Sequence, residues 1–381
     1  MRRLRVGIIA GGRSAEHEVS VASAEAVLRG IDREFFEPFL IYVDRRGRWH
    51  LPAGPAPELG DASLPALLGT TLPGVAPEAP TAASARHLPA PSDAAALQPR
   101  AALRPLAEAI DIAFLVVHGP FGEDGTLQGF LELAAIPYIG AGVLASAVAM
   151  DKVVFKDLMR AHGLPVVDYT WLRRSAWERD RDAAVERIVD AVGERTVVKP
   201  ARLGSSLGMS LVHDPRELPE ALETAFAFDS KALVERYVPA ARELEVGVLG
   251  NDEPIAFEPG EVVSHREWYD YAAKYVEGLA DVLPRAEVEP ALAERLRELA
   301  LAAYRIIDCA GMARVDFLVP SGAVYISELN TLPGFTATSM YPKQAEAAGI
   351  GFAELIARLI DLGLAAAAEG RTPGGRLEAP E

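Results

Sequence analysis

The chain opens with a pattern that few folds can accommodate: an apolar run, a glycine turn, a helical stretch and a second apolar run. Apolar periodicity predicts a buried strand at Arg5–Ile9, a helix at Val19–Leu28 and another strand at Phe39–Val43. A helix between two such strands returns the chain parallel to its start, because parallel strands need a crossover connection. The sequence therefore predicts a Rossmann-like first domain, although Gly7 and Gly11-Gly12 lack the spacing of the dinucleotide-binding fingerprint.

The segment from residue 52 to residue 105 interrupts this pattern. It holds 11 of the 28 prolines, much alanine and little periodicity. We therefore expect an irregular insertion within the first domain. Regular patterns resume with a buried strand at Asp111–Val117, and a single helix is predicted at Ser146–Ala161, ended by Gly163.

Composition disfavours two classes of partner. The net charge is −16, and an acidic surface disfavours nucleic acid and anionic membranes, although backbone N–H groups and local basic residues can still hold phosphate. No apolar stretch reaches the roughly 18 residues of a membrane span. Cys309 is the only cysteine, so an intrachain disulfide is impossible, which fits a cytoplasmic protein. Its apolar neighbours predict a packed core thiol.

A lysine-ended strand runs into a loop of small residues in the middle of the chain. The strand Thr196–Lys199 is followed by Pro200 and then by Gly204-Ser205-Ser206-Leu207-Gly208. Glycine and serine let backbone N–H groups and hydroxyls approach phosphate oxygens. The spacing is not that of a Walker A loop. Taken alone, the loop fits either a phosphate site or a flexible hairpin tip.

A hairpin near the C-terminus carries four polar residues. Strand alternation puts Arg314 and Asp316 on one face, and Glu328 and Asn330 on one face. Pro320-Ser321-Gly322 suits a three-residue loop with a bulge. Pairing residue 319 with 323 then sets Arg314 opposite Glu328 and Asp316 opposite Ile326, with all four polar groups on one face.

Asp316, Glu328 and Asn330 together offer only oxygen ligands, the set that Mg²⁺ prefers when phosphate oxygens and water complete its shell. The alternative is a solvated, salt-bridged sheet face. Zinc spacing is absent from the sequence, since His17-Glu18 is followed by no second histidine of a metalloprotease pattern.

Several segments, taken together and in order, resemble the D-alanine–D-alanine ligases of the ATP-grasp superfamily along nearly the whole chain. They are Gly11–Ser20, His118-Gly119 with Gly122–Gly129, Met150-Asp151-Lys152, Lys199–Met209, Tyr269–Tyr275 and Glu328–Thr336. Only the proline-rich insertion and the C-terminal tail fall outside the resemblance.

The resemblance implies a fold of mixed α/β and α+β type: a Rossmann-like N-terminal domain and a two-part ATP-grasp fold. The N-terminal domain would cover residues 1–140, including the insertion. The central ATP-grasp subdomain would cover 141–234, the C-terminal subdomain with the metal hairpin 235–368, and a flexible tail 369–381.

The resemblance also implies a role for each matching position. Glu16 would hold the ammonium group of the first D-alanine, with His118 beside it, while Ser339 and Met340 would border the second D-alanine. Arg314 and the Gly334 N–H would stabilise the oxyanion. ATP would contact Lys152, Lys199, Ser205, Ser206, Glu235, Glu243 and Lys274. Two Mg²⁺ or Mn²⁺ ions would bind Asp316, Glu328 and Asn330.

Tyr275 would join Ser205 and Glu16 in a hydrogen-bonded latch over the closed site. One departure from the family pattern is Ala241-Arg242 before Glu243, which alters the spacing from Glu235.

The implied activity is ATP-dependent ligation of two D-alanines through an acyl phosphate, for peptidoglycan precursors, in a cytoplasmic homodimer with no nucleic-acid or membrane partner. The alternatives are an ATP-grasp ligase for another acid and amine, a D-alanine–D-lactate ligase, and a nucleotide-binding regulator without turnover. A regulator should have a broken metal cluster, whereas Asp316, Glu328 and Asn330 are all present.

Overall fold

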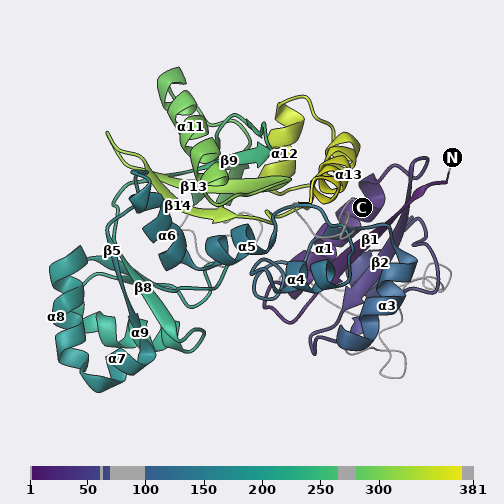
Figure 1. The fold of residues 1–381 in the computed structure, drawn as a ribbon. Coiled ribbons are helices and arrows are strands. Elements are labelled where there is room, and N and C mark those ends of the chain that lie inside the picture. Colours follow the sequence, from purple (N-terminus) through teal and green to yellow (C-terminus); the bar gives the residue numbers. More distant parts are fainter. Residues whose placement is uncertain (1, 61–62, 69–98, 265–279, 371–381) are drawn as a thin grey trace, which may run out of the picture.

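The computed structural model describes residues 2–60, 63–68, 99–264 and 280–370. Its strands form three sheets (Figure 1). The N-terminal sheet lies to the right in this view, a small antiparallel sheet lies at lower left, and a larger antiparallel sheet spans the upper middle. In the part of the chain that the structure describes, none of the helices has the length and apolar character needed to cross a membrane.

The first sheet confirms the predicted β-α-β start. Its strand order is β3-β2-β1-β4, in which β1, β2 and β4 run parallel and the short β3 is antiparallel. The helix α1 connects β1 to β2. The bounds are β1 Leu4–Gly11, α1 His17–Gly30, β2 Phe36–Val43, β3 Trp49–His50 and β4 Ile112–Leu115.

The predicted insertion is only partly irregular. Two helices lie within or across it, α2 (Leu64–Leu68) and α3 (Pro99–Ala109). The expectation of irregular structure was therefore wrong at these places. Residues 69–98 lie outside the described ranges.

The single helix predicted at Ser146–Ala161 was also wrong. It is two helices, α5 (Val143–Met150) and α6 (Lys152–Ala161), separated at Asp151. Asp151 has extended backbone angles, and its carboxylate accepts the free N–H groups of Val153 and Val154, as an N-cap residue does. The helix α4 (Thr126–Leu133) precedes this pair.

The small sheet is antiparallel, with strand order β5-β8-β6-β7. Its helices form a separate core with it, centred on the buried side chains of Trp177 and Phe226. The bounds are β5 Tyr169–Arg173, α7 Arg174–Arg179, α8 Arg181–Val192, β6 Thr196–Pro200, β7 Ser210–Val212, a 3₁₀ turn at Pro215–Glu217, α9 Leu218–Phe226 and β8 Lys231–Arg236.

The large sheet is antiparallel, with order β12-β11-β9-β13-β14 and a short β10 beside β9. Cys309 is buried in its core, as predicted, and burial raises the pKa of its thiol to about 12. The bounds are β9 Arg242–Leu249, β10 Ile255–Ala256, β11 Gly260–Ser264, β12 Ala280–Leu283, α11 Pro290–Ile306, β13 Met312–Val319, β14 Tyr325–Asn330, α12 Met340–Ala347 and α13 Phe352–Ala368.

The predicted register of the β13–β14 hairpin was wrong. Leu318 pairs with Tyr325, so the connection is longer than three residues, and the register shifts by one between Asp316 and Phe317. This irregularity sets Asp316 opposite Glu328 and Arg314 opposite Asn330. Without it, the longer loop would have put Asp316 and Glu328 on opposite faces, because side chains alternate along a strand.

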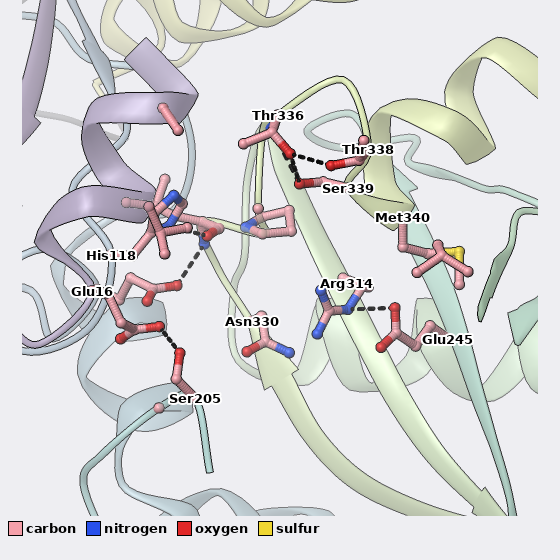
Figure 2. Close-up of a pocket in the computed structure, with 18 of the residues that line it drawn as sticks. Glu16, His118, Ser205, Glu245, Arg314, Asn330, Thr336, Thr338, Ser339 and Met340 are labelled. Atoms are coloured by element: carbon pink, nitrogen blue, oxygen red, sulfur yellow. Dashed lines mark hydrogen bonds and ion pairs between the residues drawn. The ribbon is translucent and has the colours of Figure 1, made fainter. Parts of the chain in front are cut away.

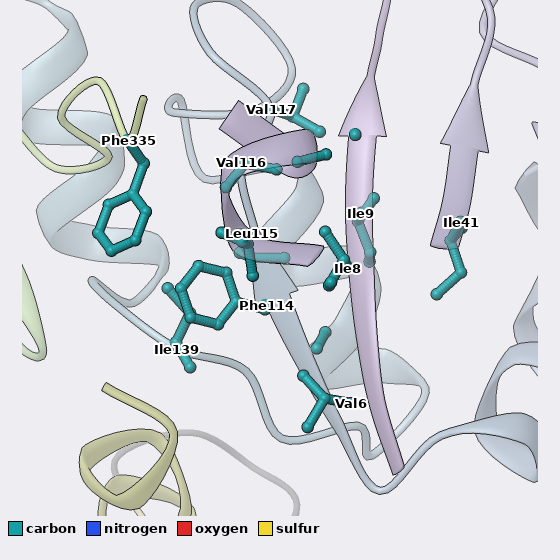
Figure 3. Packing of buried hydrophobic residues seen from close by; sticks show 14 of the residues in the cluster. Val6, Ile8, Ile9, Ile41, Phe114, Leu115, Val116, Val117, Ile139 and Phe335 are labelled. Carbon is teal, nitrogen blue, oxygen red and sulfur yellow. The ribbon is translucent and has the colours of Figure 1, made fainter. Parts of the chain in front are cut away.

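The loop after β14 is fastened to the N-terminal sheet. Phe335 is fully buried and packs edge-on against Phe114 of β4, with ring centroids 5.6 Å apart. Figure 3 shows Phe335 beside the cluster of Val6, Ile8 and Ile139. The first core therefore extends from the N-terminal sheet to the segment that follows the hairpin.

Gly11→Ala should destabilise the protein strongly. Gly11 has φ +93°, and a Cβ there would collide with the backbone carbonyl oxygen of Val43. The left-handed backbone costs about 1–2 kcal/mol and the overlap about 1–3 kcal/mol more. Gly163→Ala is the matched control, because Gly163 has φ +75° with nothing within 4 Å of the added atom. Denaturant unfolding of both variants gives the comparison, and equal losses would contradict the packing argument.

Candidate active site

Two adjoining cavities lie between the sheets, one of about 310 Å³ and one of about 230 Å³. Gly204, Ser205 and Glu245 line both. The larger cavity also contains predicted substrate residues, and the smaller contains predicted nucleotide residues. The larger is lined by Glu16, His118, Arg314, Asn330, Gly334, Ser339 and Met340, and the smaller by Lys152, Lys199, Ser206, Glu235, Glu243, Asp316 and Glu328.

Glu16 and Ser205 meet at the boundary of the two cavities (Figure 2). The Ser205 hydroxyl donates to the Glu16 carboxylate, although the two residues are 189 positions apart. Glu16 is the N-cap residue of α1 but makes no side-chain cap bond, so capping does not account for it. The predicted third member of this link, Tyr275, lies outside the described residues, as does Lys274.

His118 is held from both sides. Its Nδ1 lies 3.1 Å from the carbonyl oxygen of Leu332, and its Nε2 lies 3.0 Å from the Ser23 hydroxyl. Burial lowers the pKa of His118, so the ring is neutral at pH 7. A carbonyl can only accept, so we assign the proton to Nδ1, and Nε2 accepts from Ser23.

Glu123 joins the same two loops. Its two carboxylate oxygens accept from the backbone N–H groups of Gly119, at 2.6 Å, and Leu332, at 3.2 Å. Burial, together with the nearby Glu16 carboxylate, raises the pKa of Glu123. The loop after β4 and the loop after β14 are therefore fixed relative to each other beside the larger cavity.

Arg314 lies where the large sheet faces the larger cavity. Asp316 binds its guanidinium at two points, with Nε–Oδ1 and Nη2–Oδ2 distances of 2.7 Å each. Glu245 of the neighbouring strand lies 3.1 Å from Nε. These carboxylates raise the pKa of Arg314 although burial opposes its charge, so the guanidinium stays charged.

The oxygen atoms of Asp316, Glu328 and Asn330 on the hairpin suit a divalent ion that is also bound by phosphate. Asp316 and Glu328 are directly opposed across β13 and β14, an unfavourable pairing of like charges unless cations compensate it. Arg314 and Lys152 compensate it here, and Asn330 adds an amide 2.9 Å from Asp316. Within residues 2–60, 63–68, 99–264 and 280–370, no three His, Cys, Asp or Glu side chains form a metal-binding group. Nucleotide oxygens and water would therefore have to complete an Mg²⁺ shell.

Lys152 is not the exposed helical lysine that its position alone would suggest. It is the first residue of α6 and is 9% exposed. Its Nζ donates to the carbonyl oxygen of Leu203, at 3.0 Å, and lies 2.8 Å from Glu328. It therefore connects the glycine- and serine-rich loop to the hairpin.

Glu235 lies between two lysines in the smaller cavity. Its oxygens lie 2.6 Å from Lys156 Nζ and 2.5 Å from Lys199 Nζ. Burial opposes its ionisation, but the two ammonium groups outweigh burial and lower the pKa of Glu235 to about 2. Burial also disfavours the charged form of both lysines. At Lys199 the Glu235 carboxylate outweighs burial and the pKa is raised, whereas at Lys156 burial dominates and the pKa is lowered.

The loop above these lysines has an unusual backbone. Ser205 and Ser206 have φ values of 51° and 56°, a left-handed backbone conformation that residues other than glycine seldom adopt. Such residues persist where surrounding contacts hold them, which is common at ligand sites.

The second half of the larger cavity is the segment from Gly334 to the start of α12. Ser339 is the N-cap residue of α12, and its hydroxyl lies 2.7 Å from the Thr336 hydroxyl instead of capping the helix. Gly334 packs so closely on Ser339 that an added Cβ would lie 2.9 Å from its Oγ. The first turn of α12, with Met340, therefore opens into the cavity.

Sequence reasoning missed three residues here: Glu123, Lys156 and Glu245. Glu123 stands in a segment that resembles the family, but no role was assigned to it. Lys156 and Glu245 gave weaker signals, a lysine one helical turn after Lys152 and a glutamate two positions after Glu243 on the same strand face.

Glu235→Gln should destabilise the protein, because it removes the nearest counter-charge of two buried lysines. Removing one partner of a buried ion pair costs about 3–5 kcal/mol. Since the folded pKa of Glu235 is lowered from 4.5 to about 2, its stabilisation is present above pH 4.5 and is lost as the pH falls toward 2.

Melting temperatures between pH 2 and pH 7 test this. The variant should melt lower at pH 7 and depend less on pH below 4.5. Glu37→Gln, which removes the ion-pair partner of the half-exposed Arg3, is the control and should change stability by less than about 1 kcal/mol. A Glu235→Gln variant as stable as this control would rule out the buried-charge argument.

Comparison with known proteins covers nearly the whole chain. A family model described as D-ala D-ala ligase N-terminus matches residues 5–141, and one described as D-ala D-ala ligase C-terminus matches residues 158–361. D-alanine–D-alanine ligase A of Chromobacterium violaceum is 46% identical over 366 residues, 96% of each chain. D-alanine–D-alanine ligase of Natranaerobius thermophilus is 41% identical over 367 residues, also 96% of each chain.

Solved structures agree. The D-alanine–D-alanine ligase of Coxiella burnetii has a TM-score of 0.75 at 31% identity, covering 97% of each chain. The VanG D-Ala:D-Ser ligase of Enterococcus faecalis scores 0.74 at 29% identity, over 95% of this chain and 100% of that one. The Bacillus anthracis D-alanine–D-alanine ligase complexed with ATP scores 0.71 at 29% identity, over 97% and 100%. Matches of this length and identity show that the chain belongs to the D-alanine–D-alanine ligase family.

Proposed function

We propose that this chain joins two D-alanines into D-alanyl-D-alanine, with conversion of ATP to ADP and phosphate, for peptidoglycan precursor synthesis. The observation that carries the proposal is the meeting of two cavities at Ser205. One contains lysines suited to phosphates, and the other contains a carboxylate at Glu16 and a guanidinium at Arg314, suited to an amino acid. The family and its ATP-complexed member support the same activity.

The first step activates a carboxylate, which is a poor electrophile. The carboxylate oxygen of the first D-alanine attacks the γ-phosphorus of ATP, and the bond from that phosphorus to the β–γ bridging oxygen breaks, leaving ADP. The product is an acyl phosphate. Lys152, Lys199 and Lys274 would neutralise phosphate charge under the Ser205-Ser206 loop, and Glu235 and Glu243 would contact the adenine and ribose sides of the nucleotide.

The second step forms the amide. The ammonium group of the second D-alanine loses a proton, and the neutral amine attacks the acyl carbon. The resulting tetrahedral oxyanion collapses, phosphate leaves with the bonding electrons, and the nitrogen loses a second proton to become the amide N–H. Arg314 and the Gly334 N–H would face the oxyanion, which is the charge that develops in the transition state. Glu16 and His118 would hold the first D-alanine, while Ser339 and Met340 would border the second.

Asp316, Glu328 and Asn330 would hold two Mg²⁺ or Mn²⁺ ions, which would neutralise charge on the nucleotide phosphates. The fit rests on the opposed carboxylates of the hairpin and their closeness to Lys152. Tyr275 would complete the latch with Ser205 and Glu16 and exclude the water that would hydrolyse the acyl phosphate.

Release of ADP on addition of D-alanine, with product mass, separates the proposal from its rivals. A nucleotide-binding regulator would release no ADP. A ligase for another acid and amine would respond to other substrates. A D-alanine–D-lactate ligase would make an ester, and the D-Ala:D-Ser relative means that D-serine must be tested beside D-alanine. We expect the amide of two D-alanines to predominate.

Three further expectations accompany this proposal. The protein would act in the cytoplasm as a homodimer. Its first domain would cover residues 1–140, its central subdomain 141–234 and its C-terminal subdomain 235–368. Light scattering of the purified protein and limited proteolysis test the dimer and the boundaries.

Asn330→Leu should abolish turnover with little change in melting temperature. The change removes a neutral oxygen ligand of similar size from the proposed metal site while keeping the strand. Turnover is measured as ADP release over a range of Mg²⁺ concentrations. A variant as active as wild type would exclude Asn330 from the metal site.

Arg314→Lys should lower kcat by about 10²-fold or more, the scale for losing one oxyanion donor. Lysine keeps the charge but loses the planar fork that Asp316 now fixes through two bonds. ATP affinity, measured by calorimetry, should stay within a few-fold of wild type. A kcat within threefold of wild type would rule out the oxyanion role.

A further inference from the structure

Glu245 stands on the sheet face that forms the floor of the larger cavity. On β9 it lies directly opposite Asp316 of β13 and directly opposite Gly260 of β11. Residues opposed across a sheet project to the same side, so the Glu245 side chain shares its face with Arg314 and Asp316. The residue is only 7% exposed and lines both cavities.

Met340 lies on the other side of Glu245. The bare backbone of Gly260 makes room for the Met340 side chain, because a Cβ on Gly260 would collide with Met340 Sδ. Figure 2 shows Arg314 to the left of Glu245 and Met340 above it. The carboxylate therefore borders the part of the cavity where α12 begins, which is the proposed second-substrate end.

Three glutamates line the larger cavity. The Glu123 carboxylate is held by the backbone N–H groups of Gly119 and Leu332, and the other two lie at opposite ends. Glu16, with Ser205, is at one end, Glu245 is at the other, and Arg314 and Asn330 lie between them (Figure 2). Each amino acid that enters carries an ammonium group, which needs an anionic partner when it leaves water. Glu16 serves the first amino acid in the proposed function. The second ammonium group needs another partner.

We propose that Glu245 binds the ammonium group of the second amino acid and so makes this site select an amino acid over the hydroxy acid of the same shape. The inference rests on the proposed ligase function and adds a specificity residue to it. A hydroxyl group brings no positive charge, so a hydroxy acid would gain less from a carboxylate at this position.

A competing explanation is that Glu245 only orients Arg314. Asp316 already fixes the guanidinium through two bonds of 2.7 Å, whereas Glu245 lies 3.1 Å from the same Nε. Arg314 therefore has its orientation without Glu245. Glu245 adds negative charge beside Arg314 but is not needed to orient it, and it also lines the larger cavity beside Met340, where a ligand can reach it.

The test is competition between D-alanine and D-lactate for the second position, with full-length protein, ATP and Mg²⁺, and products separated by mass. Both products carry D-alanine in the first position, so their ratio reports the second position alone. Glu245→Gln keeps the shape and removes the charge. We expect the amide-to-ester ratio to fall about tenfold, since a charge-assisted hydrogen bond becomes a neutral one.

Glu261→Gln is the matched control. Glu261 lines neither of the two cavities. It pairs with Leu244 across the strands and thus projects from the opposite face, where it holds Arg242 at 2.6 Å. It should leave the ratio unchanged. Glu245→Asp keeps the charge, so its amide-to-ester ratio should stay close to that of wild type. This variant decides the question if Glu245→Gln fails to fold. An aspartate variant whose ratio falls tenfold would overturn the proposal.

An unchanged ratio in folded Glu245→Gln would also overturn it, and so would an equal loss of both products, which is the result expected if Glu245 acted only through Arg314. Failure of the proposed function itself looks different. Wild-type protein would then form neither product from D-alanine and ATP.

Discussion

The buried charge of Arg314 is the constraint on which the site depends. A guanidinium held away from water is tolerated only if carboxylates surround it, since an unpaired buried charge costs several kcal/mol. Asp316 on the same strand and Glu245 on the next strand meet this need. Both carboxylates must therefore face the cavity. That requirement brings three residues onto one face of the large sheet: Arg314, the proposed oxyanion donor; Asp316, a proposed metal ligand; and Glu245, the carboxylate proposed to bind the substrate ammonium group.

The N-terminal sheet takes part in the site through a few long-range contacts. Phe335 anchors the loop after β14 in the first core, and Glu123 and His118 bind the backbone of Leu332 from the loop after β4. Ser205 reaches Glu16 from the small sheet. Each sheet thus contributes one wall of the larger cavity. The walls from the N-terminal sheet and the large sheet are fixed to each other by these contacts. The third wall is the loop of Ser205 and Ser206, whose backbone is strained.

Local patterns predicted much of this fold correctly because they report local physics. Strand alternation placed Arg314 and Asp316 on one face, and the β-α-β start predicted a parallel sheet. The failures came from tertiary contacts. Asp151 breaks a helix that propensity would continue, since Lys231 holds its carboxylate at 2.5 and 2.7 Å while it caps α6. The register shift between Asp316 and Phe317 keeps Asp316 and Glu328 on the same face of the sheet, whereas the loop length alone would have put them on opposite faces.

By itself, the sequence determined the fold type, the strand faces and the family, because apolar periodicity and ordered motifs are written along the chain. Glu16 and Ser205 could be named, but only folding brought them within a hydrogen bond. Lys156 and Glu245 became visible only in three dimensions. A lysine in a helix or a glutamate in a strand is usually solvated, and burial against Glu235 or Arg314 is decided by how separate elements pack.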